Sequence, residues 1–181
     1  MDYLEIEIKI KIDRIKDISK QLEFLKFHLS DEEYFEFNIV FDTPDHQLRK
    51  TGLLLRLRQK NETSILTLKK SIFKGQTNSE YKIREEIECG VLNFENIKKI
   101  LFSLGYKIHF IYEKYRAIYR KDNIIVTIDR TPIGNFIEIE GEKECIDEVA
   151  RSLGYKKKDY IKDSYYKLFR KKNQTGHMVF K

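Results

Sequence analysis

Two short stretches of this chain place pairs of glutamates with the same spacing. The first reads EIEIK at residues 5–9, and the second reads IEIE at residues 137–140. Side chains at positions i and i+2 of a strand point to the same face, so Glu5 lies beside Glu7 and Glu138 lies beside Glu140. Such pairs are usually only the solvated face of a half-exposed strand. They are also suited to hold Mg²⁺ or Mn²⁺, which prefer oxygen ligands and bridge to substrate phosphates.

Cationic side chains share the polar faces of the other alternating stretches. They are Lys9, Arg56, Arg58, Lys69, Lys82, Arg84, Lys114 and Arg116. Lysine and arginine in a wall of low dielectric constant attract polyphosphates strongly, and arginine can bind phosphate oxygens in a bidentate manner. Carboxylates repel the same anion unless a cation is bound between them. If the acidic and basic faces meet around one cavity, they predict binding of a polyphosphate together with a divalent metal.

The composition is that of a charge-rich globular protein with a modest positive excess. The 181 residues are 35% charged and 41% hydrophobic, with a formal net charge of +6, which favours an anionic partner. No apolar run approaches ~18 residues, so no membrane span is expected. The first residues do not follow the basic-then-apolar pattern of a signal segment. Cys89 and Cys145 lie far apart in the sequence, which favours a reduced, cytoplasmic protein without a zinc site.

The elements that must position these side chains are mostly strands. Strict alternation of polar and apolar residues predicts eight of them, at 3–12, 35–42, 53–60, 64–70, 79–89, 108–120, 123–130 and 135–141. If the charged faces turn inward and the apolar faces pack under helices, the strands close into a barrel with a charged lumen. The predicted fold class is therefore α+β, with an eight-stranded antiparallel closed barrel and flanking helices.

Helical periodicity predicts four helices around the strands. They span 14–27, capped by Asp13; 94–103, capped by Asn93; 144–153; and 159–170. No linker rich in Gly, Pro or Ser interrupts the pattern, so residues 1–170 are expected to form one domain. Residues 171–181 are expected to be a disordered tail.

The charged stretches, taken in order, resemble the CYTH superfamily, the triphosphate tunnel metalloenzymes. The motifs are EIEIK at 5–9, LRLR at 55–58, LTLKK at 66–70, REEIE at 84–88, EKYR at 113–116, IDRTPIGNFIEIEG at 128–141 and DSYYKLF at 163–169. The resemblance covers roughly residues 3–170. The family includes class IV adenylate cyclases, thiamine triphosphatases and inorganic triphosphatases, so the resemblance implies an antiparallel tunnel that holds a divalent metal and a triphosphate.

The resemblance also implies a role for each charged position. Glu5, Glu7, Glu138 and Glu140 match the carboxylates of the metal site, which would take Mg²⁺ or Mn²⁺. Lys9, Arg56, Arg58, Lys69, Arg84 and Arg116 match the phosphate contacts, and alternation adds Lys82 and Lys114. Glu86 and Asp129 match further acids of the lumen, whereas Glu88 shares their face by alternation alone. Lys69, Arg84, Glu86 and Asp129 are the residues expected to act in catalysis.

Two reactions remain open for such a site. In the first, favoured for its similarity to the class IV cyclases, ATP is cyclised to cyclic AMP and pyrophosphate. In the second, water attacks tripolyphosphate, thiamine triphosphate or a nucleoside triphosphate. Only the cyclase must fix a nucleoside, and Tyr34, Phe35, Phe37, Phe41 and Phe73 are candidate contacts among which the sequence does not choose. His109 is expected to be structural rather than a catalytic base.

A third hypothesis comes from a different class of protein. The basic excess would also suit a non-catalytic binder of polyphosphate or nucleic acid, whose binding would need no metal and would weaken steeply with salt. The paired carboxylates argue against this hypothesis, so nucleic acid is not an expected partner. A small-molecule triphosphate is the expected partner, and a homodimer is left open.

Overall fold

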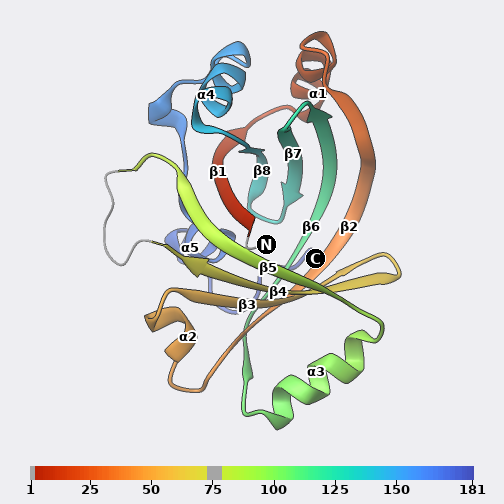
Figure 1. Ribbon diagram of the computed structural model, residues 1–181, viewed down its shortest axis with the longest axis vertical. Helices are drawn as coiled ribbons and strands as arrows, with labels where there is room; N and C mark the ends of the chain where they lie inside the picture. Colours follow the sequence, from red (N-terminus) through yellow and green to blue (C-terminus); the bar gives the residue numbers. More distant parts are fainter. Residues whose placement is uncertain (1–2, 73–78) are drawn as a thin grey trace.

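The computed structural model describes residues 3–72 and 79–181, and in it eight antiparallel strands form a closed barrel (Figure 1). The strands are β1 (Tyr3–Ile12), β2 (His28–Asp42), β3 (Leu53–Lys60), β4 (Thr63–Ser71), β5 (Lys82–Val91), β6 (Lys107–Lys121), β7 (Ile124–Thr131) and β8 (Gly134–Glu140). Their order around the barrel is β1-β5-β4-β3-β2-β6-β7-β8. This architecture confirms the α+β closed barrel predicted from the alternation of residues.

Helices flank the outside of the barrel. They are α1 (Ile15–Phe24), α2 (Gln47–Lys50), α3 (Phe94–Ser103), α4 (Lys143–Ser152) and α5 (Tyr165–Lys171), with a short 3₁₀ turn at Lys157–Asp159. In Figure 1, α1 and α4 lie at one end of the molecule and α3 lies at the other. None of the helices among the described residues is both long and apolar enough to cross a membrane.

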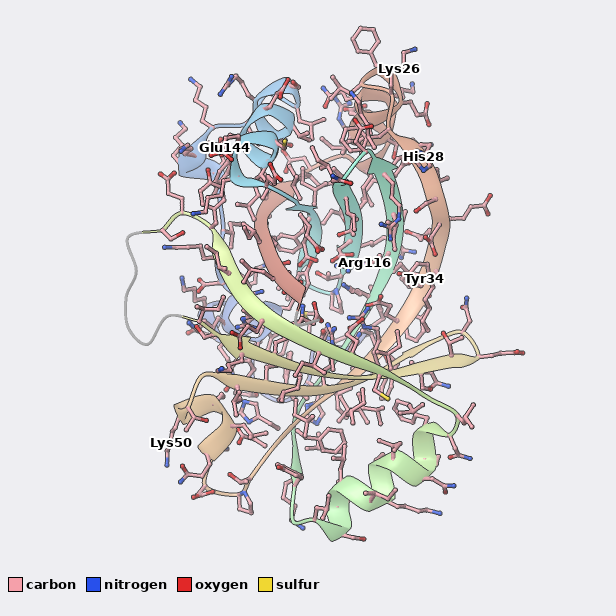
Figure 2. All side chains as sticks on the ribbon, in the orientation of Figure 1. Lys26, His28, Tyr34, Lys50, Arg116 and Glu144 are labelled. Atoms are coloured by element: carbon pink, nitrogen blue, oxygen red, sulfur yellow. The ribbon has the colours of Figure 1, made fainter. Side chains whose placement is uncertain are left out.

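The main hydrophobic core lies between the outer face of the barrel and these helices. Ile8, Ile10 and Ile12 of β1 are almost fully buried and pack in one cluster with Leu22 of α1 and Ile146 of α4. Burying such a side chain contributes roughly 1.5–3 kcal/mol. Because successive side chains alternate across a strand, packing the isoleucines outward turns the glutamates and lysine of β1 into the lumen. Figure 2 places Arg116 among the barrel strands, whereas Lys26, Lys50 and Glu144 lie at the edge of the molecule.

The second strand begins earlier than the alternation predicts. Residues His28–Phe35 pair with β6, but the register shifts between Leu29 and Asp31 and again between Asp31 and Tyr34. Each irregularity interrupts the two-residue period, so the sequence of this part does not show the alternation that is typical of a strand. Strand β5 begins at Lys82, three residues after the start at 79 that the alternation predicts.

Several helix boundaries also differ from the prediction. Helix α1 ends at Phe24, because Lys26 adopts a left-handed φ of 67° and Phe27 turns back into the core. Its N-cap is Arg14 without a side-chain cap bond, so the expected Asp13 cap is wrong, whereas Asn93 caps α3 as predicted. The last helix starts at Tyr165 rather than 159. The backbone before it is held extended, where Ile161 bonds to Lys9.

The end of the chain is ordered, contrary to the expected disordered tail. Met178 is fully buried; its N–H donates to the carbonyl of Ile111 at 2.9 Å, and its carbonyl accepts from the N–H of Glu113 at 2.9 Å. The N–H of Phe180 also donates to the Glu113 carboxylate at 2.9 Å. The polar composition of residues 171–177 conceals this docking, because a single buried methionine and the backbone provide most of it.

Candidate functional site

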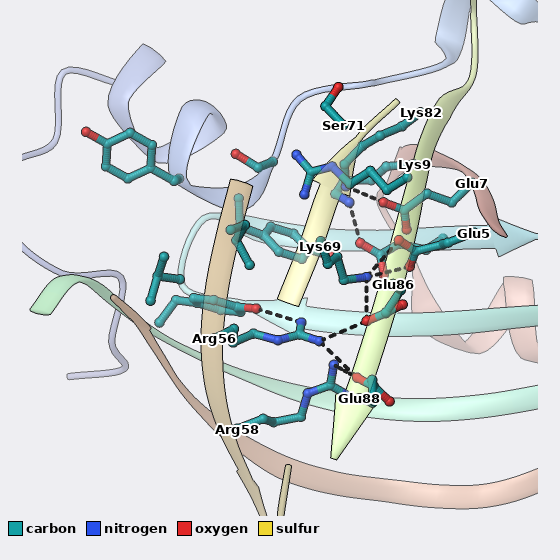
Figure 3. Close-up of a pocket in the computed structure, with 18 of the residues that line it drawn as sticks. Glu5, Glu7, Lys9, Arg56, Arg58, Lys69, Ser71, Lys82, Glu86 and Glu88 are labelled. Atoms are coloured by element: carbon teal, nitrogen blue, oxygen red, sulfur yellow. Dashed lines mark hydrogen bonds and ion pairs between the residues drawn. The ribbon is translucent and has the colours of Figure 1, made fainter. Parts of the chain in front are cut away.

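A cavity of about 1120 Å³ runs through the barrel, and the predicted site residues gather on its wall. All of them except Asp129 line it: Glu5, Glu7, Lys9, Arg56, Arg58, Lys69, Lys82, Arg84, Glu86, Lys114, Arg116, Glu138 and Glu140. Glu88 lines it as well. Figure 3 shows acidic side chains of β1 and β5 facing basic side chains of β3 and β4 across this space. The charged faces therefore meet inside the barrel and not in bulk solvent.

The two glutamates of β1 are each held by a lysine. The Lys69 ammonium donates to both oxygens of Glu5, at 2.6 and 2.7 Å, and lies 3.0 Å from Glu86. Lys82 donates to Glu7. These lysines come from β4 and β5, so the closed sheet brings together residues more than sixty positions apart.

The glutamates of β8 meet β1 from the other side. Glu138 lies directly opposite Lys9 and accepts hydrogen bonds from Lys9 and Arg116. Glu140 lies directly opposite Glu7 on the neighbouring strand, and both line the cavity. Like charges that face each other across two strands are unfavourable unless a counter-charge lies near them. This arrangement is suited to a cation.

Asp129 lies beside the cavity but does not reach its surface. The carboxylate is fully buried and accepts from Arg116 Nε and Nη2, both at 2.6 Å, from the Tyr165 hydroxyl at 2.6 Å and from Lys114 at 3.1 Å. Its oxygens are therefore occupied by protein donors. Through these contacts Asp129 orients Arg116 and fastens α5 to the barrel, and the catalytic role expected of it from the sequence stays a prediction.

Arg56 and Arg58 project from β3 toward the acids of β5. Arg56 Nη1 donates to the Tyr112 hydroxyl at 3.3 Å, and its Nη2 lies 3.7 Å from Glu86 and 3.6 Å from Glu88 (Figure 3). Arg58 lies 3.7 Å from Glu88 and 3.7 Å from Glu36. These longer separations are ion pairs rather than close hydrogen bonds. The guanidinium groups keep donor capacity for a ligand.

Burial and neighbouring charges set the protonation of the acids. Burial raises the pKa of Glu7, but the positive charges of Lys82, Lys9 and Lys69 together outweigh it and lower that pKa to about 2. Burial likewise raises the pKa of Glu138, yet Lys9 and Arg116 hold it well below its usual range. For Glu86 burial prevails over Lys69, and its pKa is raised. A buried carboxyl with a raised pKa in a cavity is a candidate proton acceptor.

The sequence reasoning missed Glu36, a fully buried acid of the lumen face. Its Oε2 lies 3.4 Å from the Lys114 ammonium, and Arg58 approaches its other oxygen. Glu36 falls within the predicted strand at 35–42, at even spacing with Asn38. The alternation of that strand was the signal that could have found it. Tyr112 and Tyr165 were not among the predicted site residues, because aromatic side chains are usually assigned to the core, although Tyr165 lies in the motif DSYYKLF.

Glu36 makes a testable contribution to the pH dependence of stability. Burial raises its pKa, but Lys114 and Arg116 lower it below the usual 4.5. Its pairing therefore stabilises the fold above about pH 4.5 and loses this effect as the pH falls through the lowered folded-state pKa. We expect Glu36→Gln to destabilise the protein by roughly 1–3 kcal/mol at pH 7, because Lys114 loses one of its two carboxylate partners and keeps only Asp129, and by less near pH 3. Urea unfolding at both pH values measures this difference.

The matched control for Glu36→Gln is Glu85→Gln, which removes a carboxylate from the outer face of β5. Glu85 pairs with Lys70 at 3.0 Å, and both side chains are largely exposed. Exposed pairs contribute about 0–1 kcal/mol, so this variant should change stability little at either pH. A gap between wild type and Glu36→Gln that stays constant from pH 7 to pH 3 would show that the charge of Glu36 does not stabilise the fold.

The carboxylate oxygens of the lumen are suitable ligands for a hard divalent cation, although in this structure they accept hydrogen bonds from lysines. Among the residues that the structure describes, no three Asp, Glu, His or Cys side chains converge as a ready metal site. Glu5, Glu7 and Glu138 bond to Lys69, Lys82 and Lys9 instead. These carboxylates come from the adjacent strands β1 and β8, and carboxylate oxygens are what Mg²⁺ and Mn²⁺ prefer.

The aromatic residues singled out in the sequence have mostly structural contacts. Phe35 packs on Tyr115 and Phe37 on Phe94, while the Tyr34 hydroxyl donates to Glu36 at 3.3 Å. Phe41 lines the cavity. Phe73 lies outside the described residues.

Comparisons with known proteins agree on the family of this chain. The family model described as "CYTH domain" matches residues 3–165. A Methanocaldococcus jannaschii protein, provisionally named an adenylate cyclase, is 31% identical over 177 residues, which cover 91% of this chain and 98% of that protein.

Solved structures share the fold at lower identity. A Vibrio parahaemolyticus protein, also provisionally named an adenylate cyclase, superposes with a TM-score of 0.81 at 17% identity, covering 94% of this chain and 99% of that one. A Hippeastrum protein superposes with a TM-score of 0.67 at 20% identity, covering 94% and 97%. The latter is described as a provisional adenylyl cyclase that reveals a dominant triphosphatase activity.

Proposed function

Since this chain belongs to the CYTH domain family, we propose that it is a divalent-metal-dependent enzyme that transfers phosphoryl groups of a triphosphate bound in the barrel. The favoured reaction is the conversion of ATP to cyclic AMP and pyrophosphate. The observation that supports it best is the convergence of acidic and basic side chains from several strands on one cavity.

The pairing of these side chains explains how a polyanion enters a lumen that contains so many carboxylates. Lys69 and Lys82 are bound to Glu5 and Glu7, and Lys9 is bound to Glu138. A triphosphate competes with these carboxylates for the same lysines. A divalent metal, when bound by the acids, supplies Lewis-acid stabilisation of the phosphate oxygens and frees the lysines to contact phosphate.

Cyclisation requires a nucleophile, an electrophile and a proton acceptor held in line. The ribose 3′-oxygen attacks the α-phosphorus. The bond from that phosphorus to the oxygen that bridges the α- and β-phosphates breaks, and pyrophosphate leaves with the bonding electrons. In this proposal Arg56, Arg58 and Lys69, which line the cavity, neutralise the leaving phosphates. Glu86, with its raised pKa, is our candidate for the acceptor of the 3′-hydroxyl proton.

Hydrolysis of the terminal phosphate is the second candidate, because the Hippeastrum protein of the same fold is described as having dominant triphosphatase activity. The same lumen would then position water in place of the 3′-oxygen. The non-catalytic binder remains the third alternative, and it would show no turnover.

One experiment separates these alternatives. The protein is incubated separately with ATP, thiamine triphosphate and tripolyphosphate, with Mg²⁺ or Mn²⁺, and the products are identified. Cyclic AMP with pyrophosphate supports the cyclase, and release of free phosphate supports the triphosphatase. Absence of turnover for all three substrates contradicts the proposed enzyme. A chelator should abolish any activity observed.

The exchange of partners in the lumen can be tested by binding alone. In Glu7→Gln the ammonium of Lys82 loses its carboxylate and becomes available to phosphate. We expect this variant to bind tripolyphosphate about tenfold more tightly than wild type in the presence of a chelator, since hydrogen bonds to charged groups contribute roughly 1.5–3 kcal/mol. Conversely, Lys82→Met frees Glu7, and binding of Mn²⁺ alone should strengthen. Titration calorimetry measures both affinities.

Glu85→Gln serves as the control for Glu7→Gln, because it removes one negative charge from the outside of the same barrel. It should leave the metal-free affinity for tripolyphosphate within about twofold of wild type, because an exposed charge is screened. An affinity of Glu7→Gln equal to or below that of wild type would show that Lys82 is not released to the ligand.

A further inference from the structure

Part of the cavity wall is not charged at all. Val40, Leu54, Phe110 and Tyr112 line it, and we call these four residues the apolar section. Phe110 and Tyr112 stack at a ring-centroid distance of 5.9 Å. A bare tripolyphosphate chain gains nothing from such a wall, because apolar groups cannot replace the hydration of an anion. An apolar wall with a few placed polar groups is typical of a site for an organic ligand.

The apolar section adjoins the cations expected to bind phosphate. Val40 pairs with Arg56 on one side and with Phe110 on the other. Leu54 lies directly opposite Lys69 on β4. The hydroxyl of Tyr112 accepts a hydrogen bond from Arg56 at 3.3 Å. A ligand whose phosphates contact Arg56 and Lys69 therefore places its next group, a few ångströms away, against the apolar section.

Three polar side chains border the apolar section, and we call Arg49, His109 and Tyr166 the rim. Arg49 Nη1 donates to His109 Nε2 at 3.0 Å and to the Tyr166 hydroxyl at 3.1 Å. The Tyr166 ring lies 4.8 Å from that of His109 and 5.1 Å from that of Phe110, so the rim is continuous with the wall. All three rim residues line the same cavity.

The rim offers both hydrogen-bond donors and acceptors to a neutral polar group. Because arginine only donates, Nε2 of His109 is the accepting nitrogen, and the other ring nitrogen carries the proton. Burial, together with the charge of Arg49, lowers the pKa of His109 and keeps the ring neutral. No ion pair joins Arg49 to a carboxylate within the described part of the chain. Its remaining donors are not committed to an acid.

The volume of the cavity allows more than a triphosphate. At about 1120 Å³ it is slightly larger than the usual sites for drug-sized molecules, which measure roughly 300–1,000 Å³. The apolar section and the rim thus supply a flat wall, polar edges and space in one place. A nucleobase has the matching properties, because it is flat, neutral and edged with donors and acceptors.

We infer that the apolar section and the rim hold the base of a nucleoside triphosphate, with Tyr166 and Arg49 as the residues that select it over inorganic tripolyphosphate. This inference rests on the proposed function, because it requires that the phosphates occupy the charged part of the lumen. It selects aromatic residues of β6 and α5, and none of the candidates of residues 34–41 or 73.

The test compares two ligands in the whole chain with Mg²⁺. ATP reports on both the charged lumen and the base site, whereas the inhibition constant of tripolyphosphate against ATP turnover reports on the charged lumen alone. In Tyr166→Ala and in Arg49→Ala we expect the KM for ATP to rise about tenfold or more. The inhibition constant of tripolyphosphate should stay within about twofold of wild type. Arg49 is exposed on the four-residue α2, so its replacement does not endanger the barrel.

Two matched variants complete the design. Tyr166→Phe keeps the ring but removes the hydroxyl bonded to Arg49, so it should lose less affinity for ATP than Tyr166→Ala. Arg151→Ala removes an exposed arginine of α4 that does not line the cavity, and it should change neither constant.

The possible results divide clearly. A rise in KM for ATP with an unchanged inhibition constant supports the base site. Equal losses for both ligands, or no change for either, overturn it. Turnover of tripolyphosphate without turnover of ATP in the wild type also overturns the base site but leaves a triphosphatase intact. If no triphosphate is turned over, the proposed function itself has failed.

Discussion

A Glu138→Gln variant is expected to lose metal-dependent turnover by about 100-fold or more while the barrel stays folded. Glu138 is the acid of β8 that reaches Lys9 and Arg116, and its pKa is held well below the usual range, so it is fully ionised at neutral pH. Glutamine keeps the shape of the side chain but removes the charge needed to bind a hard cation. Lewis-acid stabilisation by a metal is worth several kcal/mol, and each 1.36 kcal/mol is a factor of ten in rate.

The fold should survive this change because Arg116 keeps a second partner. Asp129 holds Arg116 through two hydrogen bonds of 2.6 Å, and these do not depend on Glu138. Turnover is measured at saturating Mg²⁺ or Mn²⁺, Mn²⁺ binding is measured by equilibrium dialysis, and unfolding is measured by heating. Glu85→Gln is the matched control and should retain full activity. Full activity of Glu138→Gln would remove Glu138 from the metal site.

The second large effect is expected for Arg56→Lys, which keeps the charge but loses the planar guanidinium. Arg56 reaches Tyr112, Thr67 and the acids of β5 from one side chain, so its position is held from several directions. Lysine cannot reproduce a bidentate contact with phosphate. We expect the KM for the triphosphate to rise about tenfold or more, since hydrogen bonds between charged groups contribute roughly 1.5–3 kcal/mol, with a smaller change in kcat.

Arg130→Lys provides a control of the same chemistry outside the lumen. Arg130 makes a two-point contact with Glu33 on the surface, with nitrogen–oxygen distances of 2.8 and 3.3 Å. Its replacement should leave KM unchanged and cost at most about 1 kcal/mol of stability. If Arg56→Lys and Arg130→Lys have the same KM, then Arg56 does not contact the substrate.

The two-residue period of the strands made most of the candidate site predictable. On β1 the isoleucines and the charged residues occupy opposite faces because of backbone geometry alone, so alternation is enough to assign the glutamates and Lys9 to one face. The same reasoning assigned Arg56 and Arg58 to the charged face of β3. It failed at residues 28–34, where bulges interrupt the period, and it missed Glu36, although the period of the predicted strand places Glu36 on one face with Asn38.

Other features depend on contacts that no local pattern encodes. Asp129 shares a face with Thr127, and nothing in its neighbourhood predicts that Tyr165, thirty-six positions later, covers it and takes it out of the cavity. The end of the chain shows the same limit, because Met178 becomes buried only against the finished β6.

By itself the sequence therefore determined which side chains share a face, because alternation is a property of each strand alone. Only the tertiary structure decided that these faces close around one cavity, which lysine each glutamate takes as its partner, and where the wall becomes apolar. The physical reason is that ion pairing acts over a few ångströms between strands far apart in the chain, and the distances are set by closure and register of the whole barrel.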